Sequence, residues 1–537
     1  MEKCFNTEGQ CIPELHYMVK LDDRLDRIKR FYIDGGKYFI INRGRQYGKT
    51  TTLYALEKYL EDEYIVVSLD FQGISTAEFS DEYIFTKAFM RMFAEALEDG
   101  GAAMEEVRPA VEFMEKTERS TLSEMFYVLS NICKIASKPI VMMIDEVDNT
   151  GNNQVFIDFL ALLRMYYLKR RKKPIFHSVV LAGVYDIKNL KLKIRPEENH
   201  QYNSPWNIAA VFDVDMSFSA DQIAAMLNEY EKDQHVGMDV KAVSEEIYQY
   251  TSGYPYLVSA ICKILDEELS GKDGFTERFG SQGYGNRREV WSNHGVTEAV
   301  KMILNQNAPL FDSMVKQLDV YRELRDMLEE LIYQGKRIPF SPVEKSINLG
   351  FMFGFLKNVG GYVGIANRIF EMYLLNLFIA EEAVGSEIFF YGQGSRNQFV
   401  KDAKLDMKLV LEKFVIHFTE IYGSNDEKFT EKYGRKFFLL YLKPIINGRG
   451  NYYLEAQTRD ARRTDVIVEY AGEQFIVELK IWYGNEYHER GQEQLAEYLD
   501  YYHQDKGYLL SFNFNKNKKI GVREVQIGSK TIVEAVV

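Results

Sequence analysis

The sequence lacks the features of membrane and secreted proteins. Its 537 residues contain no apolar run long enough to span a bilayer, and MEKCFNTEGQ, at the start, has no hydrophobic signal-peptide segment. The four cysteines include no C-x-x-C pair, which argues against a zinc knuckle and against a disulfide framework. We therefore expect a reduced, cytoplasmic protein that does not contact a membrane.

The sequence also lacks an excess of positive charge. Its formal net charge is −13, which argues against a protein that coats nucleic acid through bulk electrostatics. Residues 386–537 contain 22 Lys and Arg and 22 Asp and Glu, so residues 1–385 carry the whole acidic excess. Any contact with nucleic acid should therefore be local, and the neutral C-terminal region is the better place for it.

The composition is that of a soluble chain with several domains, since 46% of the residues are hydrophobic. Apolar strands alternate with helical patterns, which predicts an α/β fold with a doubly wound parallel sheet. The predicted strands of this sheet are 37–42, 63–72, 139–149 and 176–186. The predicted domains are an α/β core at 1–215, a helical lid at 216–270, a linker at 271–294, a winged-helix-like domain at 295–385 and a second α/β domain at 395–537.

Residues 41–53, INRGRQYGKTTTL, match a phosphate-binding loop except at one glycine. The usual pattern, G-x-x-x-x-G-K-[ST], has its first glycine where this chain has Arg43, and a glycine follows one place later. The loop lies between a predicted strand and a predicted helix, as such loops require. Its lysine would reach nucleotide phosphates, and the first hydroxyl of the helix would ligate Mg²⁺. The predicted nucleotide-binding residues of this loop are Gly44, Gly48, Lys49, Thr50 and Thr51.

A second motif supports the first. Residues 141–148, VMMIDEVD, form an apolar strand that ends in Asp145 and Glu146. We expect Asp145 to hold Mg²⁺ and Glu146 to polarise the attacking water as a catalytic residue. Asp148 is expected to be solvated. The two motifs together predict binding of ATP and Mg²⁺, whereas hydrolysis depends on the geometry of Glu146.

These motifs, together with HYMV at 16–19 and LDFQ at 69–72, resemble the bacterial AAA-like ATPases related to the STAND class. The resemblance covers about residues 1–380 and implies that Arg43 is a family variation. It also implies that Gly253 and Pro255, in the sequence GYP, belong to a cofactor-binding G-x-P element near the adenine. A simple helix break is the alternative. The resemblance allows a nucleotide-dependent homo-oligomer.

Basic residues outside these motifs leave two questions open. KRRKK, at 169–173, could contact nucleic acid or a phosphate, but a basic run at a helix end is more often a solvated face. An arginine finger could be supplied by any of three residues that the sequence does not distinguish: Arg164, Arg170 and Arg195.

Residues 462–482, RRTDVIVEYAGEQFIVELKIW, predict two strands joined by a turn at 471–472. Asp465 begins the first strand, and Glu478 and Lys480 share one face of the second. Two carboxylates and a lysine suit metal-dependent cleavage of a phosphodiester. A glutamate and a lysine two residues apart on a strand are, however, more often a surface charge pair.

Asp465…Glu478-Leu-Lys480 resembles the PD-(D/E)XK nuclease signature, with Thr464 where a proline is usual. The resemblance covers about residues 395–520, and the helix at 490–502 is similar to the Q-x-x-x-Y helix of part of that superfamily. The catalytic residues that it implies are Asp465, Glu478, Lys480, Gln494 and Tyr498. Mg²⁺, or Mn²⁺, would bind Asp465, Glu478 and one helix glutamate, in order of preference Glu431, Glu427 or Glu455.

These motifs predict an ATP-binding and ATP-hydrolysing regulatory enzyme that controls a Mg²⁺-dependent nuclease. Its expected partner is nucleic acid, DNA rather than RNA, in defence against foreign DNA or in mobile-element maintenance. The alternative is a STAND-type signalling NTPase whose C-terminal domain binds nucleic acid or a partner without cleaving. A scaffold with two vestigial sites is a third possibility, and the intact chemistry of both motifs weighs against it.

Overall fold

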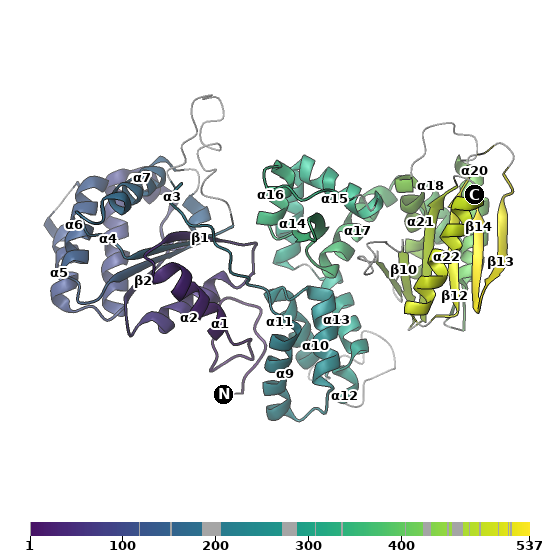
Figure 1. The fold of residues 1–537 in the computed structure, drawn as a ribbon, viewed down its shortest axis with the longest axis horizontal. Coiled ribbons are helices and arrows are strands. Elements are labelled where there is room, and N and C mark those ends of the chain that lie inside the picture. Colours follow the sequence, from purple (N-terminus) through teal and green to yellow (C-terminus); the bar gives the residue numbers. More distant parts are fainter. Residues whose placement is uncertain are drawn as a thin grey trace. The chain divides into compact units, whose positions relative to one another are not determined.

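The computed structural model describes most of the chain (Figure 1). The chain divides into two compact units. The first unit is Met1–Ala299 with Phe351–Phe355, and the second is Val300–Gly350 with Leu356–Val537. The described residues are 2–116, 119–150, 153–184, 206–270, 287–306, 308–334, 337–402, 404–422, 431–447, 450–453, 466–471, 473–482, 485–502, 504–513, 515 and 518–537.

The first unit is built on a four-stranded parallel sheet. Its strands are β1 (Tyr38–Asn42), β2 (Ile65–Asp70), β3 (Ile140–Asp145) and β4 (Ser178–Gly183), in the spatial order β1-β4-β3-β2. Every residue of β3 and β4 is buried, as expected for a parallel sheet covered on both faces. The predicted parallel α/β fold is therefore confirmed, with each strand shorter than the apolar run that predicted it.

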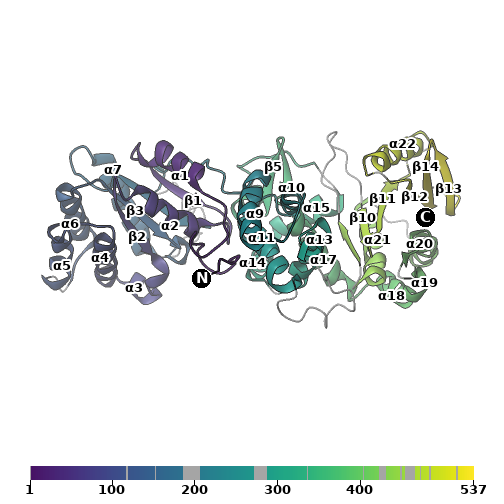
Figure 2. The ribbon, with the colours of Figure 1, turned by 90° about the horizontal axis from the view of Figure 1, so that it is seen from below.

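Helices cover both faces of this sheet (Figures 1 and 2). They are α1 (Asp22–Ile28), the π-helical turn η1 (Lys29–Ile33), α2 (Lys49–Leu60), α3 (Thr76–Ser80), α4 (Glu82–Asp99), α5 (Met104–Lys116), α6 (Leu122–Ile135) and α7 (Gln154–Lys169). Successive strand residues point to opposite faces, so Tyr38 and Ile40 enter the core beneath α3–α7. Phe39 and Ile41 enter the separate core beneath α1 and α2.

A helical region completes the first unit. It consists of α9 (Ala220–Gln234), α10 (Val240–Thr251), α11 (Pro255–Lys263), the π-helical η5 (Ile264–Leu269), α12 (Arg287–Val290) and the first half of α13 (Asn293–Asn305), which continues into the second unit from Val300. A break at the GYP sequence separates α10 from α11, because Ser252 and Gly253 have φ values of 47° and 74° and Pro255 begins α11. The described part of the predicted linker is largely helical, since α12 and the start of α13 lie within it.

The second unit begins with helices and a hairpin. These are α14 (Pro309–Val320), α15 (Arg322–Gln334), α16 (Lys345–Met352), β5 (Leu356–Val359), β6 (Tyr362–Ile365) and α17 (Arg368–Ala383). The winged-helix-like domain stays a prediction for this range. The glycine-rich and polar composition of 385–398, GSEIFFYGQGSRNQ, predicts a loop, but the segment instead contains α18 (Glu387–Gly394) and the start of α19 (Arg396–Phe399). Burial of Ile388 accounts for the helix, because α18 has an apolar side to pack.

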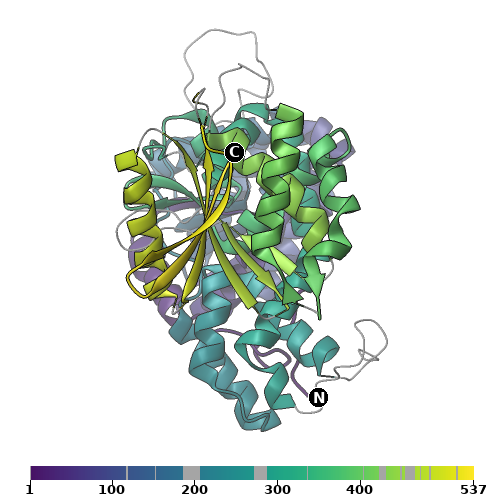
Figure 3. The same cartoon turned by 90° about the vertical axis from the view of Figure 1, so that its right-hand side faces the viewer.

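The rest of the second unit is a six-stranded mixed sheet with helices on both faces (Figure 3). The two-residue strands β7 (Val400–Lys401) and β8 (Lys404–Leu405) pair with each other in a separate sheet before it. The elements of the six-stranded sheet and its helices are α20 (Met407–Tyr422), α21 (Glu431–Ile446), β9 (Gly450–Tyr453), β10 (Val466–Tyr470), β11 (Glu473–Ile481), α22 (Asn485–Tyr501), β12 (Lys506–Phe512), β13 (Gly521–Ile527) and β14 (Lys530–Val536). The sheet order is β13-β14-β12-β11-β10-β9, and β11, β12 and β14 are parallel. Leu495 and Leu499 of α22 pack on β11, β12 and β14, whereas α20 and α21 lie on the other face (Figure 3).

In the part of the chain that the structure describes, no helix has both the length and the apolar character needed to cross a bilayer.

Candidate functional site

The loop between β1 and α2 has the backbone of a phosphate-binding loop. Gly48 has a φ of 75°, a conformation that glycine adopts readily, and α2 begins at the next residue. Lys49 Nζ donates hydrogen bonds to the carbonyl oxygens of Arg43 (3.1 Å) and Gly44 (3.0 Å). The lysine therefore lies over the loop at the amino end of a helix, where a nucleotide phosphate is favoured.

Thr50 and Asp145 come together from two distant parts of the sequence. Thr50 Oγ1 donates a hydrogen bond of 2.7 Å to Asp145 Oδ2, where β3 ends. A hydroxyl and a carboxylate are hard oxygen ligands, which suit Mg²⁺ in the presence of nucleotide phosphates and water. The residues present thus fit the predicted ion in chemical type.

Glu146 follows Asp145 in an uncommon conformation. Its φ is 52°, and its backbone N–H donates to Asp145 Oδ1 at 2.9 Å. Strained non-glycine residues of this kind cluster at functional sites. Burial, with a smaller contribution from the neighbouring charge of Asp145, raises the pKa of Glu146. A raised pKa makes the ionised carboxylate a stronger base, which suits proton transfer from water.

The surroundings of Lys49 change its pKa as well. Burial lowers the pKa of Lys49, and the nearby carboxylates of Asp148, Glu146 and Asp145 oppose that change. Asp148 is not simply solvated, because its Oδ2 accepts a hydrogen bond from the backbone N–H of Val184 at the end of β4. The expectation for Asp148 was wrong, since the sequence did not show that β4 ends beside it.

Arg43 anchors the start of the loop. Its guanidinium donates to the backbone oxygens of Asn42 (3.0 Å) and Val214 (3.1 Å) and lies 5.5 Å from the ring centre of Phe212. Gly44 is tightly enclosed, because an added Cβ would lie 2.5 Å from the backbone oxygen of Phe353. The arginine thus fastens the loop to the segment after the sheet, while the displaced glycine satisfies a packing requirement.

Placing the motif's usual glycine at position 43 should destabilise the folded protein. Arg43→Gly is expected to lower the free energy of unfolding by about 2 kcal/mol, because two side-chain hydrogen bonds and an aromatic contact are lost. Urea titration measures this effect. Arg45→Gly is the matched control, because Arg45 lies in the same loop with an exposed side chain. Equal stability of the two variants would contradict the anchoring role.

The GYP element lies beside this loop. An added Cβ at Gly48 would lie 3.9 Å from Cβ and Cγ of Pro255, the first residue of α11. The Tyr254 hydroxyl donates to the backbone oxygen of Arg45, and its ring centre lies 4.6 Å from that of Tyr47. Burial raises the pKa of Tyr254 well above its usual value, so the hydroxyl stays protonated and keeps donating. Sequence reasoning missed both tyrosines, although each is adjacent to a motif glycine.

Other predicted residues have different positions. Thr51 Oγ1 accepts a hydrogen bond from the backbone N–H of Cys11 (3.1 Å), which joins the N-terminal segment to α2. Arg170 Nη1 donates to the backbone oxygen of Gly36 at the amino end of β1, the opposite edge of the sheet from Lys49. Arg195 lies outside the described residues. The identity of an arginine finger therefore stays open.

Three residues of the second candidate site meet between β11 and α22. Glu478 is 0% exposed, and its Oε1 lies 2.9 Å from Lys480 Nζ. Lys480 Nζ also donates to Gln494 Oε1 at 3.5 Å. Because Glu478 is fully buried, the surface charge pair considered from the sequence is wrong. Tyr498, one turn after Gln494 on α22, is 5% exposed.

The remaining residues of this site are only partly described. Asp465, Glu427 and Glu455 lie outside the described residues, and Glu431 begins α21 as the sequence predicted. Within the described ranges, no three His, Cys, Asp or Glu side chains gather as a metal site. The predicted ion would therefore need Asp465 beside Glu478, and its binding stays a prediction.

A neighbouring polar cluster was missed from the sequence. Glu534 of β14 is 0% exposed and accepts hydrogen bonds from Gln492 of α22 and, at 2.6 Å, from Arg523 of β13. The strand register places Glu478 and Glu534 on either side of Leu509. The cluster therefore links α22 to β14 and β13, the last two strands at one end of the same sheet. A lone glutamate in TIVEAVV carried no signal of this role.

The parallel sheet, the loop before α2 and the acidic end of β3 together define a P-loop ATPase-like domain. The AAA-like domain family matches residues 23–294, which is half of the chain, and the protein belongs to this family.

Several solved structures are similar to this chain. A Walker-type ATPase of Pyrococcus abyssi has 13% identity and a TM-score of 0.46, with 69% of this chain and 99% of that chain covered. The ORC2 protein of Aeropyrum pernix, in ADPNP–ADP complexes, has 11% identity and a TM-score of 0.38, with coverage of 70% and 98%. The ORC1 protein of Aeropyrum pernix, in complex with DNA, has 14% identity and a TM-score of 0.31, with coverage of 68% and 94%. No curated protein matches the chain.

Proposed function

We propose that this protein is an ATP-regulated nuclease. Its first unit binds and hydrolyses ATP with Mg²⁺, and the nucleotide state controls metal-dependent cleavage of DNA by the C-terminal α/β region. The proposed role is defence against foreign DNA or mobile-element maintenance. The observation that carries the nuclease part is the buried Glu478 in contact with Lys480, which in turn reaches Gln494.

The ATPase part is supported by groups already in contact. Lys49 covers the loop at the amino end of α2, and the 2.7 Å Thr50–Asp145 hydrogen bond places two oxygen ligands for Mg²⁺ together. The ion, when bound, would neutralise charge on the transferred phosphate. Glu146 would accept a proton from the attacking water, because burial raises its pKa.

Control by nucleotide is supported by the position of α11. Tyr254 and Pro255 stand at its amino end and contact the phosphate-binding loop through Arg45 and Gly48. A change in the loop between nucleotide states would therefore act directly on this helix. Coupling of this kind requires differential contacts in the two states, and these residues are in a position to make them.

At the nuclease site the chain would supply three functions. Glu478, which pairs with Lys480, would hold the metal together with Asp465, and the metal would supply an activated water and a Lewis acid. Lys480 would orient that water or stabilise negative charge on the scissile phosphate. Gln494 fixes the lysine amine through its side-chain oxygen. The balanced charge of residues 386–537 makes this region the better DNA contact.

The test is cleavage of linear, nicked and single-stranded DNA in Mg²⁺ or Mn²⁺, with and without ATP. Lys480→Ala should abolish cutting, and Lys49→Ala should abolish the response to ATP. Lys404→Ala is the matched control in the same unit, because its side chain is 75% exposed. Unchanged cutting by Lys480→Ala would refute the assigned site. No cutting by wild type, with ATP still bound, would favour the signalling NTPase.

A further inference from the structure

A cavity of about 470 Å³ lies at the amino ends of β1, β3 and β4. Its lining comes mainly from the turns before the three strands, at residues 34–36, 136–139 and 174–177, together with Arg170 at the end of α7. Lys49 and Asp145 occupy the opposite edge of the sheet, at the carboxyl ends of β1 and β3. The cavity is therefore separate from the nucleotide site, which in parallel α/β folds takes the carboxyl edge.

Arg170 is held in place at this cavity by two contacts. Its Nη1 donates to the backbone oxygen of Gly36 at 2.7 Å, and its guanidinium carbon lies 4.1 Å from the ring centre of Tyr167. An arginine has five N–H donors in a planar fork that matches a carboxylate or a phosphate. A guanidinium ordered before binding loses less side-chain entropy when it pairs with such a group.

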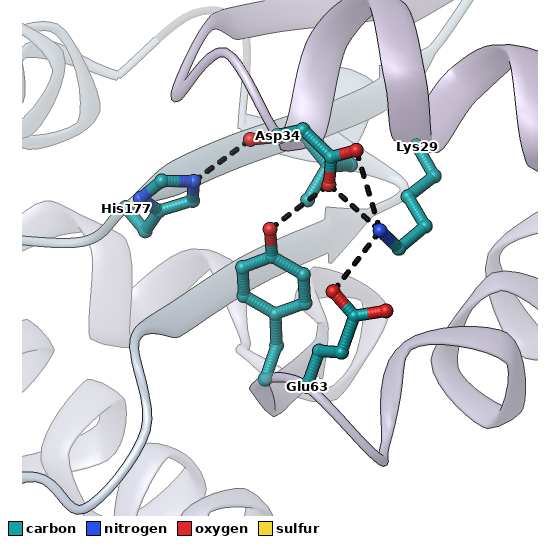
Figure 4. Close-up of polar contacts among 6 residues, drawn as sticks. Lys29, Asp34, Glu63 and His177 are labelled. Carbon is teal, nitrogen blue, oxygen red and sulfur yellow. Dashed lines mark hydrogen bonds and ion pairs between the residues drawn. The ribbon is translucent and has the colours of Figure 1, made fainter.

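His177 is ordered in the same way (Figure 4). Its Nε2 lies 2.9 Å from the backbone oxygen of Ile33, and its ring centre lies 5.4 Å from that of Tyr64. Since a carbonyl oxygen can only accept, Nε2 carries the proton, and Nδ1 is the nitrogen left for a ligand. Two polar side chains on the turn before β4 are thus oriented by contacts with the turn before β1.

The acid at this cavity is already compensated. Asp34 Oδ1 accepts hydrogen bonds of 3.0 Å from Lys29 Nζ and from the Tyr64 hydroxyl, and Lys29 also reaches Glu63 at 3.1 Å (Figure 4). The hydrogen bond to Asp34, helped by Glu63, raises the pKa of Lys29 to about 12, so Lys29 stays charged. Asp34 is therefore already engaged by Lys29 and Tyr64, whereas Arg170 and Lys138 carry the positive charge of the lining.

The rest of the lining combines positive charge with apolar surface. Lys138 lines the cavity beside Arg170, and the exposed run 169–173, KRRKK, adds further positive charge at the end of α7. Pro139 and Pro174, which are exposed lining residues, supply apolar surface, whereas Ile175 and Phe176 behind them are buried in the core. A ligand with one anionic group and a small apolar body would match both features.

We propose that this cavity binds a small organic anion, a carboxylate or phosphate ester on an apolar or ring-shaped body, whose charged group pairs with Arg170. The basic run beside the cavity would attract such a ligand, and Arg170 would orient it. This site does not depend on the nuclease proposal, because all its residues belong to the AAA-like domain.

The test uses phenyl phosphate as the probe and isothermal titration calorimetry as the measurement. Wild type should bind the probe, and Arg170→Ala should weaken binding by about tenfold or more, because a charge-assisted hydrogen bond is lost. Arg171→Ala is the matched control, since it removes the same charge from the adjacent exposed residue, which does not line the cavity. Lys49→Ala reports any binding at the phosphate loop, and benzyl alcohol tests the need for the charge.

Four results would overturn the proposal: no binding to wild type, unchanged binding to Arg170→Ala, an equal loss in Arg171→Ala, or loss in Lys49→Ala. Far-UV circular dichroism checks that Arg170→Ala is folded. If it is not folded, Arg170→Lys replaces it, since lysine keeps the charge and loses the planar fork. Binding by the lysine variant should then be weaker than by wild type, and equal binding would count against the assignment of Arg170.

Discussion

Replacing Lys49 by alanine is expected to slow ATP hydrolysis by about 100- to 1,000-fold, the usual cost of removing one preorganised charge from a transition state. Lys49 Nζ lies over the loop oxygens of Arg43 and Gly44, and three carboxylates close by help to keep it protonated although burial lowers its pKa. Release of inorganic phosphate from ATP and Mg²⁺ under steady-state conditions measures the loss.

Lys58→Ala is the control for this change. Lys58 belongs to the same helix, α2, and is exposed, with its amine 4.8 Å from the ring centre of Tyr54. Its removal changes the net charge equally without touching the loop. A Lys49→Ala protein that hydrolyses ATP at the rate of Lys58→Ala would show that the loop is not the site of hydrolysis.

Gly253→Ala should lower the free energy of unfolding by about 3 kcal/mol or more, because backbone strain and a steric collision combine. The φ of Gly253 is 74°, and an added Cβ would lie 1.8 Å from the backbone oxygen of Phe218. That oxygen cannot move freely, since the N–H of Phe218 donates to the Gly253 oxygen at 2.9 Å. Urea unfolding measures the change in stability. Nucleotide affinity should fall as well, because Tyr254 and Pro255 would shift from the loop.

Gly101→Ala separates the two costs. Gly101 has a φ of 80°, and nothing lies within 4 Å of an added Cβ. This variant therefore has the backbone strain without the collision. It should lower the free energy of unfolding by only about 1 kcal/mol. Equal destabilisation by the two substitutions would mean that the contact with Phe218 contributes nothing.

Local patterns in the sequence were sufficient for the elements that position the nucleotide site. The helix predicted directly after the phosphate-binding loop is α2, and the apolar run ending in Asp145 is β3. Both follow from interactions within a few residues, namely strand hydrophobicity, a glycine before a helix and helical periodicity. The same kind of reasoning placed Glu478 and Lys480 on one strand, because side chains alternate between faces.

Contacts between distant residues could not be read in this way. Arg43 occupies a position where the motif predicts glycine, and its bond to Val214 explains it only once the segment after the sheet is in place. Asp148 was expected in solvent for the same reason, since its partner Val184 directly follows a distant strand, β4. A buried polar group must find a hydrogen-bond partner, but the identity of that partner depends on the packing of the whole domain.

The sequence by itself determined the parallel α/β core, the phosphate-binding loop and the E-x-K strand, because these depend on short-range periodicity and residue spacing. Only the tertiary structure decided which of their side chains meet. It placed Pro255 beside Gly48, Gln494 beside Lys480, and Arg170 at a cavity on the opposite edge of the sheet. Such pairings form because buried polar groups must find hydrogen-bond partners while the apolar surfaces around them pack. No short stretch of sequence contains that information.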